Sequence, residues 1–368
     1  MKPLTWQRLP ATALVHDREV QSAWDSLNLQ RQSLPFMCAE VVAAALAIFG
    51  TGKEQLFSAS VLGKPVAMFV LVPDGAMRWR TFQPSQMPLG TWVAVVDVEL
   101  HGICRSLMRG PLGLCMVLSI TQVDPLLAPR CEDKADSLHI DYIDTAWLEI
   151  RGEFNDYWAA RGKNLRQNLR KQRSRILADG TAVQLRVFHG VEDMAPALAR
   201  YGALEGKGWK AGEGTAIEAD NEQGRFYTRL FESAATRGEA FISEYLLNGE
   251  TAAMNLALLR DGVLVVLKTA YDESLPKSLS PAFLLREEEL QYLFAQGNVC
   301  RMEYYGRVMD WHTKLTEQRR TLYHLTIYRW PLLKGLALRR QARTATPLPV
   351  ASETELASMP SASGQTSG

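Results

Sequence analysis

The fold is decided by the stretch AFISEYLLNGETAAMNLALLRDGVLVVLKTAY, which spans residues 240–271. Three apolar runs are separated by two short polar breaks, Asn248-Gly249 and Asp261-Gly262. Both dipeptides favour tight hairpins, because asparagine, aspartate and glycine tolerate the positive φ that such turns need. The stretch therefore predicts three antiparallel strands that follow one another as a meander.

The residues after this meander predict a helix and one more strand. Ser280 is placed as the N-cap of a helix that runs from Pro281 to Ala295, since proline is favoured at the first helical position. Gly297 ends this helix, and the run CRMEYY at 300–305 predicts the next strand. The second half of the chain thus has the order strand, strand, strand, helix, strand.

The first half shows the same order with weaker signals. Three strands are expected at 56–62, 65–73 and 77–83. A helix-compatible run follows at 93–108, and a last strand is expected at 112–120. A pattern that recurs in this way indicates a divergent internal repeat of a whole α/β unit. We expect a first unit at 1–150 and a second unit at 151–335. The residues from about 341 to 368 are rich in Ser, Thr, Ala and Pro, and they predict a disordered tail.

Composition limits the classes of function. The chain has 41 basic and 40 acidic residues, so it has no global attraction for DNA. Its five cysteines form no CxxC pair, which argues against a zinc site and suits a reducing, cytoplasmic location. The strongest apolar run, at 41–49, is too short to span a membrane and predicts a buried helix.

Two segments of the second half point to a ligand. Residues 157–178 contain no Asp or Glu, and Lys163, Arg166, Arg170 and Arg173 share one helical face. This face is either a solvated side of an amphipathic helix or an anion-binding surface. The stretch EGKGWKAGEGTAI at 205–217 places Trp209 and Lys210 among four glycines, which allow a ligand to approach the backbone closely. An ordinary surface loop is the alternative.

Taken together, these motifs resemble the GNAT-superfamily acetyltransferases of the cellulose-biosynthesis family, the CelD/BcsL or BioF-like acyltransferases. The resemblance rests on KNLRQNLRKQRSRILADG, GWKAGEGTAI, RFYTRLF, AYDESLPKSLSPAFLL and GRVMDWHTKLT, in this order along the second half. It implies two tandem GNAT-like units, each a mixed, mainly antiparallel sheet flanked by helices, of which the first is degenerate. One residue departs from the pattern, since Ala282 stands where many members have glycine.

The resemblance also implies transfer of an acyl group from acyl-CoA, with acetyl-CoA as the first candidate, to an amine or a hydroxyl. No metal is expected to take part. The cofactor would lie along the third strand of the meander and on the start of the following helix, where backbone amides favour a diphosphate. The residues implied are Lys268, Thr269, Ala270, Ser280, Pro281, Ala282 and Phe283.

Acid–base chemistry is expected on the strand after that helix. Glu303 and Tyr305 are two residues apart and would share one face, with Glu303 as the base and Tyr305 as the acid that protonates the thiolate. The alternative is a solvated strand face. The resemblance points further to Asp310 and Lys314. His312 lies between these two and has a side chain that can titrate near neutrality, although a lone histidine is more often structural.

The acceptor is expected to be a small molecule or a saccharide, for example a precursor of an envelope polysaccharide. Trp209 and Lys210 would line its side of the site, while Arg166 and Arg170 would hold an anionic acceptor, a nucleotide-linked sugar or the phosphates of the cofactor. Two other interpretations stay open at this point. One is a Fem-like ligase that uses aminoacyl-tRNA, and the other is a catalytically silent GNAT-like scaffold.

Overall fold

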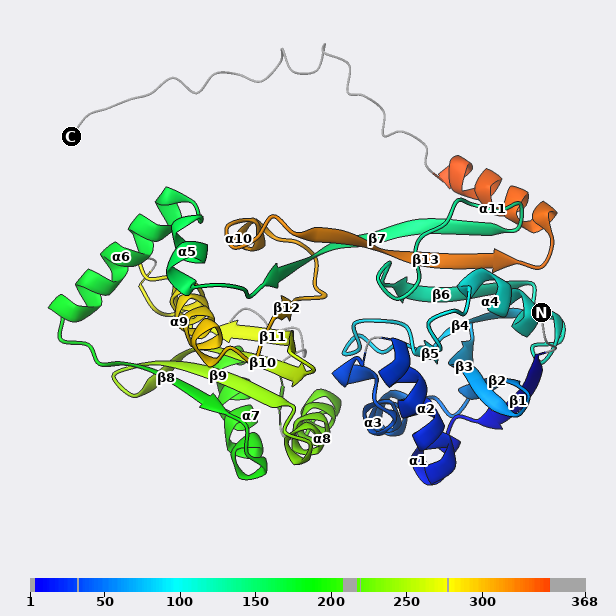
Figure 1. Cartoon of the computed structure of the whole chain (residues 1–368), viewed down its shortest axis with the longest axis horizontal. Coiled ribbons are helices and arrows are strands. Elements are labelled where there is room, and N and C mark those ends of the chain that lie inside the picture. Colours follow the sequence, from blue (N-terminus) through cyan, green and yellow to red (C-terminus); the bar gives the residue numbers. More distant parts are fainter. Residues whose placement is uncertain (1–3, 32, 208–216, 219, 277, 345–368) are drawn as a thin grey trace, which may run out of the picture.

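The computed structural model describes residues 4–31, 33–207, 217–218, 220–276 and 278–344. These residues form one sheet of 13 strands, which is flanked by helices (Figure 1). The predicted fold class, two α/β units with mixed sheets, is confirmed. Trp209 and Lys210 lie outside the described residues. Residues 345–368 of the predicted tail lie outside them as well.

The first repeat of the structure extends from residue 5 to residue 123. Its elements are β1 (Thr5–Pro10), α1 (Ala13–His16), α2 (Arg18–Arg31), the short 3-10 helix η1 (Pro35–Met37), α3 (Ala39–Phe49), β2 (Gln55–Val61), β3 (Lys64–Pro73), β4 (Arg78–Thr81), β5 (Trp92–Ala94), α4 (Leu100–Arg109) and β6 (Val117–Val123).

The second repeat extends from residue 183 to residue 303. Its elements are β8 (Val183–Phe188), α7 (Val191–Glu205), α8 (Glu222–Thr236), β9 (Ala240–Leu247), β10 (Glu250–Arg260), β11 (Val263–Tyr271), α9 (Pro281–Gln296) and β12 (Arg301–Glu303). The remaining elements are β7 (Ser137–Glu149), α5 (Phe154–Ala159), α6 (Lys163–Ala178), α10 (Asp310–Thr313), β13 (Arg319–Tyr328) and α11 (Pro331–Thr344).

The two repeats have the same topology. In each, a first strand pairs antiparallel with the meander, as β1 does with β2 and β8 with β9. In each, the last strand of the meander pairs in parallel with the strand that follows the helix, as β4 does with β6 and β11 with β12. The internal repeat predicted from weak sequence signals is therefore a repeat of topology.

Strands are exchanged between the repeats. β7 follows the first repeat along the chain but pairs with β12, whereas β13 follows the second repeat and pairs with β6. β7 and β13 also pair with each other, and the two long strands join both halves of the sheet (Figure 1). The strand order is β1-β2-β3-β4-β6-β13-β7-β12-β11-β10-β9-β8. Because β13 falls within 151–335 yet pairs with β6, the boundary at residue 150 stays a prediction.

The predicted hairpins of the second half are confirmed. Asn248 and Gly249 have φ values of 50° and 82°, and Asp261 and Gly262 have values of 49° and 77°. Two consecutive residues with positive φ form the type of turn whose twist matches that of paired strands. The local dipeptides therefore set the register of β9, β10 and β11.

Three local predictions are wrong in detail. The run 93–108 is not one helix, because residues 92–94 form β5 against β3 and α4 begins only after Glu99, which caps it. β12 ends at Glu303 and Tyr305 has a φ of 48°, so these two residues do not share a strand face. Residues 341–344 of the predicted tail belong to α11.

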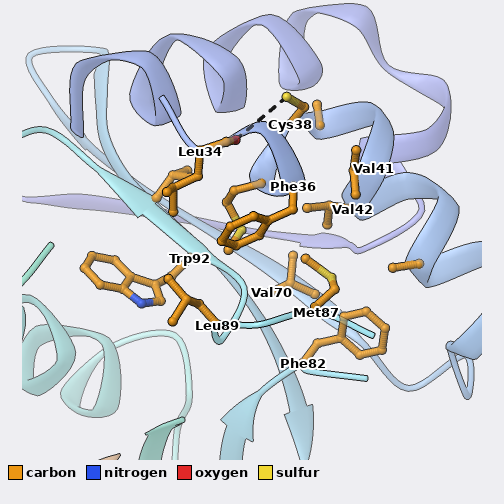
Figure 2. Packing of buried hydrophobic residues seen from close by; sticks show 14 of the residues in the cluster. Leu34, Phe36, Cys38, Val41, Val42, Val70, Phe82, Met87, Leu89 and Trp92 are labelled. Carbon is orange, nitrogen blue, oxygen red and sulfur yellow. Dashed lines mark hydrogen bonds between the residues drawn. The ribbon is translucent and has the colours of Figure 1, made fainter. Parts of the chain in front are cut away.

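The core of the first repeat forms where α3 and η1 cover the sheet. Phe36, Val41 and Val42 face Val70 and a group of side chains from the segment that follows β4 and from the first residue of β5 (Figure 2). This group comprises Phe82, Met87, Leu89 and Trp92. The apolar run at 41–49 is thus a buried helix, as predicted. Within the part of the chain that the structure describes, no helix is both long and apolar enough to cross a bilayer.

A buried ionic network lies where the exchanged strands meet. Arg320 of β13 donates to both carboxylate oxygens of Asp124, at 2.8 and 2.7 Å, and to Glu303 at 2.9 Å. The hydroxyl of Tyr305 donates to Asp124 at 3.1 Å. Burial raises the pKa of Glu303, and the charge of Arg320 opposes this shift. Burial also disfavours the charge of Arg320, but hydrogen bonds and the two carboxylates raise its pKa overall.

We expect Arg320→Met to lower the free energy of unfolding by about 3–5 kcal/mol, because it leaves the buried carboxylate of Asp124 without its cation and Glu303 with Arg301 alone. The loss should grow as the pH rises, because removal of the Arg320 charge raises the pKa of Glu303 further, and the variant must then bury an ionised acid at high pH. Urea denaturation at several pH values measures both effects. Arg319→Met, on the exposed neighbour, is the control and should stay within about 0.5 kcal/mol of the wild type. Equal effects of the two substitutions would contradict this role of the network.

Candidate functional site

β11 and β12 separate after a short parallel contact. Their pairing covers only Val263–Val265 with Arg301–Glu303. The register of β10 and β11 then shifts, because Ala257 pairs with Val266 and Leu256 with Lys268, which leaves Leu267 as an extra, bulged residue. After β12 the chain follows β7, where the amide of Tyr304 donates to the carbonyl of Ala146. Residues 266–271 therefore have no strand partner on this side within the described chain.

α9 begins beside this opening. The carbonyl of Ser280 accepts hydrogen bonds from the amides of Phe283 and Leu284, at 2.9 and 3.0 Å. The amide of Ser280 donates to the side chain of Gln172 in α6, at 2.8 Å. Ser280 therefore caps α9 through its backbone, and its position is fixed by α6.

A cavity of about 530 Å³ lies between α6 and the start of α9. Its walls include three of the predicted site residues, namely Ser280, Phe283 and Lys314. The ammonium of Lys314 lies 5.3 Å from the ring centre of Phe283. Arg161, Asn168 and Gln172 are among the polar residues that complete the walls. The structure thus joins a cation, amide side chains and a helix start around one space.

Arg286 is the most unusual charge near this cavity. Its side chain is only 6% exposed, and one guanidinium nitrogen donates to the carbonyl of Ala282 at 3.0 Å. The guanidinium carbon lies 3.8 Å from the ring centre of Trp311. Burial lowers the pKa of Arg286, and no carboxylate of the described residues forms an ion pair with it. The buried carboxylate of Glu289, three residues further along α9, opposes this shift through its charge but forms no ion pair with Arg286. A buried charge that is only partly compensated favours an anion beside it.

The other predicted residues of the cofactor strand point in different directions. Thr269 donates to Asn255, which in turn donates to the buried carboxylate of Glu289 on α9. Lys268 faces α7 and α8 instead, where its ammonium lies 3.0 Å from Glu205. Figure 1 shows α9 on one face of this sheet and α7 with α8 on the other. Of these two side chains, therefore, only Thr269 lies on the face that α9 covers.

The charged pair of Lys268 and Glu205 lies at the base of the segment that contains Trp209 and Lys210. Glu205 is buried near the end of α7, and its carboxylate also accepts from the amide of Ile217 at 3.0 Å. Residues 208–216 lie outside the described chain, but both ends of this segment are therefore anchored at Glu205. Gly206, the one described glycine of the four, has a φ of −71° and so does not use the left-handed freedom expected of it.

A second cavity, of about 520 Å³, lies between the two repeats. Arg80, Gln83, Gln86 and the rings of Phe49 and Phe82 line it from the first repeat. The second repeat contributes the start of α8, residues 221–223. Gln223 accepts a hydrogen bond of 3.4 Å from Lys268, so the charged pair adjoins this cavity. The lining is rich in amide and hydroxyl groups, with two aromatic faces.

The predicted basic face of α6 is divided. Arg173 forms ion pairs with Glu287 and Glu288 of α9, at 2.9 and 2.5 Å, so it joins the two helices. Arg166 donates to the carbonyl of Arg161, and Arg170 is exposed. Neither Arg166 nor Arg170 is among the residues that line the cavity at α9. Their assignment as ligand residues stays a prediction.

The predicted acid–base residues are not gathered at one point. Glu303 and Tyr305 belong to the network of Arg320, in which the Tyr305 hydroxyl donates to Asp124. Asp310 is exposed at the start of α10, whereas Lys314 borders the cavity. The catalytic roles given to these four residues stay predictions. Among the described residues, no group of three or more His, Cys, Asp or Glu side chains could hold a metal ion.

Comparison with known proteins assigns the second half to a domain class. Residues 163–323 match the family model described as an acetyltransferase (GNAT) domain. The chain therefore contains a GNAT-superfamily acetyltransferase domain, which extends from the start of α6 into β13. No curated protein matches the chain in sequence.

Two solved structures share the fold over almost their whole length. One is the C-terminal domain of a putative lysylphosphatidylglycerol synthetase from Agrobacterium fabrum, with a TM-score of 0.53 and 15% identity, which covers 88% of this chain and 96% of that one. The other is FemX, with a TM-score of 0.51 and 10% identity, which covers 86% of this chain and 98% of that one. At such identities the likeness concerns the fold alone.

His312 does not titrate near neutrality, contrary to the sequence-based expectation. Burial and the charge of Arg286 lower the pKa of His312 to about 4. The amide of Met309 donates to Nδ1 of the ring at 2.9 Å, so Nδ1 is the unprotonated nitrogen. The imidazole is therefore a neutral structural group beside the buried guanidinium.

We expect His312→Asn to flatten the pH dependence of stability. In the wild type the unfolded chain binds a proton near pH 6.5, whereas the folded chain does so only near pH 4, so stability falls as the pH drops through this window. Relative to the variant, the wild type should lose about 3 kcal/mol of its free energy of unfolding. Chemical denaturation between pH 7 and pH 4 measures this difference. His16→Asn, which changes an exposed imidazole, is the control; a His312→Asn curve parallel to the wild type would refute the shifted pKa.

Proposed function

We propose that this protein transfers an acyl group from acyl-CoA, with acetyl-CoA as the first candidate, to an amine or a hydroxyl of an acceptor. The observation that carries the proposal is the separation of β11 from β12 at the bulge of Leu267, directly beside the start of α9. GNAT domains as a class use acyl-CoA, and the family match covers these elements.

The residues at the start of α9 suit an anionic donor. A helix N-terminus favours a diphosphate, because its amides point outward and its dipole is positive there. Ser280, Pro281, Ala282 and Phe283 would surround this group, with Lys314 at the cavity wall. Arg286, which forms no ion pair among the described residues, adds a positive charge one turn into the helix. The negative charge of the diphosphate and the positive charges of Lys314 and Arg286 are therefore complementary.

The unpaired edge of β11 suits the reacting end of the donor. A thioester supplies an activated carbonyl, whose oxygen gains negative charge as the acceptor attacks. Backbone amides that already point at this oxygen would stabilise the charge without reorganisation. Residues 266–271 present such amides, and Ala270 has too small a side chain to block the approach. In this proposal positioning and backbone polarisation contribute most of the acceleration.

The cavity between the repeats is the proposed acceptor site. Its amide and hydroxyl groups match the hydroxyls of a saccharide, and Phe49 and Phe82 offer flat apolar faces. Lys268 of β11 and Glu205 of α7 adjoin this cavity through Gln223, so an acceptor amine or hydroxyl would enter beside them. Trp209 and Lys210, on the segment anchored at Glu205, would complete this side. A precursor of an envelope polysaccharide, as in the CelD/BcsL family, is the acceptor that we propose.

A second candidate is a ligase that takes its acyl group from aminoacyl-tRNA. One observation favours it, since α6 exposes Lys163, Arg170, Lys171 and Arg175 and contains no acidic residue. Binding of tRNA through phosphate contacts would weaken steeply with salt. Filter binding of tRNA at low and high salt separates this candidate from an acyl-CoA-dependent transferase.

The direct test is an assay of thiol release with acetyl-CoA and longer acyl-CoAs, against amino sugars and polyamines. We expect acyl-CoA to bind in calorimetry and Lys314→Met to weaken its Kd about tenfold, because one charge-assisted contact to phosphate is lost. Lys171→Met removes an exposed cation outside the cavity and should leave the Kd unchanged.

Absence of binding by any acyl-CoA would overturn the proposal. Binding without thiol release, for every acceptor tried, would support the catalytically silent scaffold instead. Equal Kd values for the two lysine variants and the wild type would mean that acyl-CoA does not bind in the cavity at α9.

A further inference from the structure

One end of the molecule exposes a set of large apolar side chains that nothing above uses. Trp330, Leu332 and Leu336 at the start of α11 are 54%, 74% and 47% exposed, and Leu114 is 71% exposed. We refer to these four residues as the α11 patch. Single exposed leucines are common on protein surfaces, but a contiguous set marks an interaction site.

Hydrogen bonds place Leu114 beside the start of α11. The guanidinium of Arg329 donates to the carbonyl of Gly113 at 2.7 Å, and the amide of Arg329 donates to the carbonyl of Met116 at 2.9 Å. The loop before β6 and the turn before α11 are therefore joined. Leu114 and Trp330 each follow one of these bonded residues directly, so the patch combines two segments that are distant in sequence.

α11 is fixed to the sheet by its other face. The ammonium of Lys334 donates to the carbonyls of Lys134 and Ser137, at 2.8 and 2.7 Å. Figure 1 shows the helix beside β7 and β13, at the end of the molecule that is far from α6. Leu332, Leu336 and Arg339 are four and three residues apart, so they share the opposite, outward face. The helix thus presents leucines near its start and a cation one turn later.

The charge of α11 identifies the kind of partner. Its sequence, PLLKGLALRRQART, contains four basic residues and no acidic residue. A helix with exposed leucines, a tryptophan at its start and only basic charges has the composition of segments that lie in the interface of anionic bilayers. A second copy of this chain would bring like charges together, which disfavours dimerisation through this face.

We propose that the α11 patch docks the protein on the surface of an anionic lipid bilayer, with Trp330, Leu332 and Leu336 inserted at the level of the headgroups. The helix would lie along the surface, and Arg339 would face the lipid phosphates. This interaction is independent of the proposed transferase activity. It would hold the chain beside lipid-anchored substrates.

The test is co-sedimentation of the full chain with phosphatidylcholine vesicles that contain about one quarter phosphatidylglycerol. We expect the wild type to bind these vesicles, to bind less at high salt, and to bind vesicles of phosphatidylcholine alone weakly. The double variant Leu332→Asp/Leu336→Asp should lower the partition coefficient at least about tenfold, because it places acids where apolar side chains would insert.

The matched control is Leu62→Asp. Leu62 is 76% exposed and lies in the turn between β2 and β3. This turn and the turn from β3 into β4 are at opposite ends of β3. The φ of 51° at Leu62 suits aspartate, so the control keeps the turn. Equal binding of the control and the wild type, with unchanged thermal unfolding of all variants, would support the proposal.

Two results would overturn it. One is that the wild type does not bind anionic vesicles. If light scattering then shows a concentration-dependent dimer that the double variant does not form, the patch is a self-association surface. The other is equal vesicle binding by the double variant and the wild type, which would place the lipid contact elsewhere, for example on α6.

Discussion

The antiparallel pairing of β7 with β13 is the interaction on which the rest of the structure depends. Each of these strands follows one repeat along the chain and pairs with the last strand of the other repeat, so one continuous sheet replaces two separate ones. Arg320 secures this joint, since it reaches Asp124 of the segment after β6 and Glu303 of β12 at the same time. Neither repeat can move away without exposing a buried ionic network.

The joint also shapes the candidate site. Because the chain after β12 follows β7, it leaves β11 at the bulge of Leu267, and the edge of β11 is freed for a ligand. α6 holds the other wall through the hydrogen bonds of Gln172 to Ser280 and the ion pairs of Arg173 with α9. The first repeat is therefore more than a degenerate copy. It forms most of the cavity proposed for the acceptor, and the residues that follow it, Asp124 and β7, fix the end of β12.

Local features of this fold could be predicted from the sequence, whereas the long-range ones could not. Two dipeptides were enough to predict the meander, because asparagine or aspartate before glycine determines the turn by itself. The exchange of β7 and β13 leaves no local pattern, and Arg320 and Asp124 are 196 residues apart. Arg286 precedes three glutamates and has the sequence appearance of a surface charge, yet it is buried.

The central claim is that an acyl-CoA binds along the free edge of β11 and at the start of α9. Hydrogen–deuterium exchange with and without acetyl-CoA tests this most directly, because it reports the protection of individual backbone amides. We predict slower exchange in peptides that cover 266–271 and 278–286, with no change in β1 to β4 of the first repeat. Protection confined to the first repeat, or to α6 alone, would contradict the account.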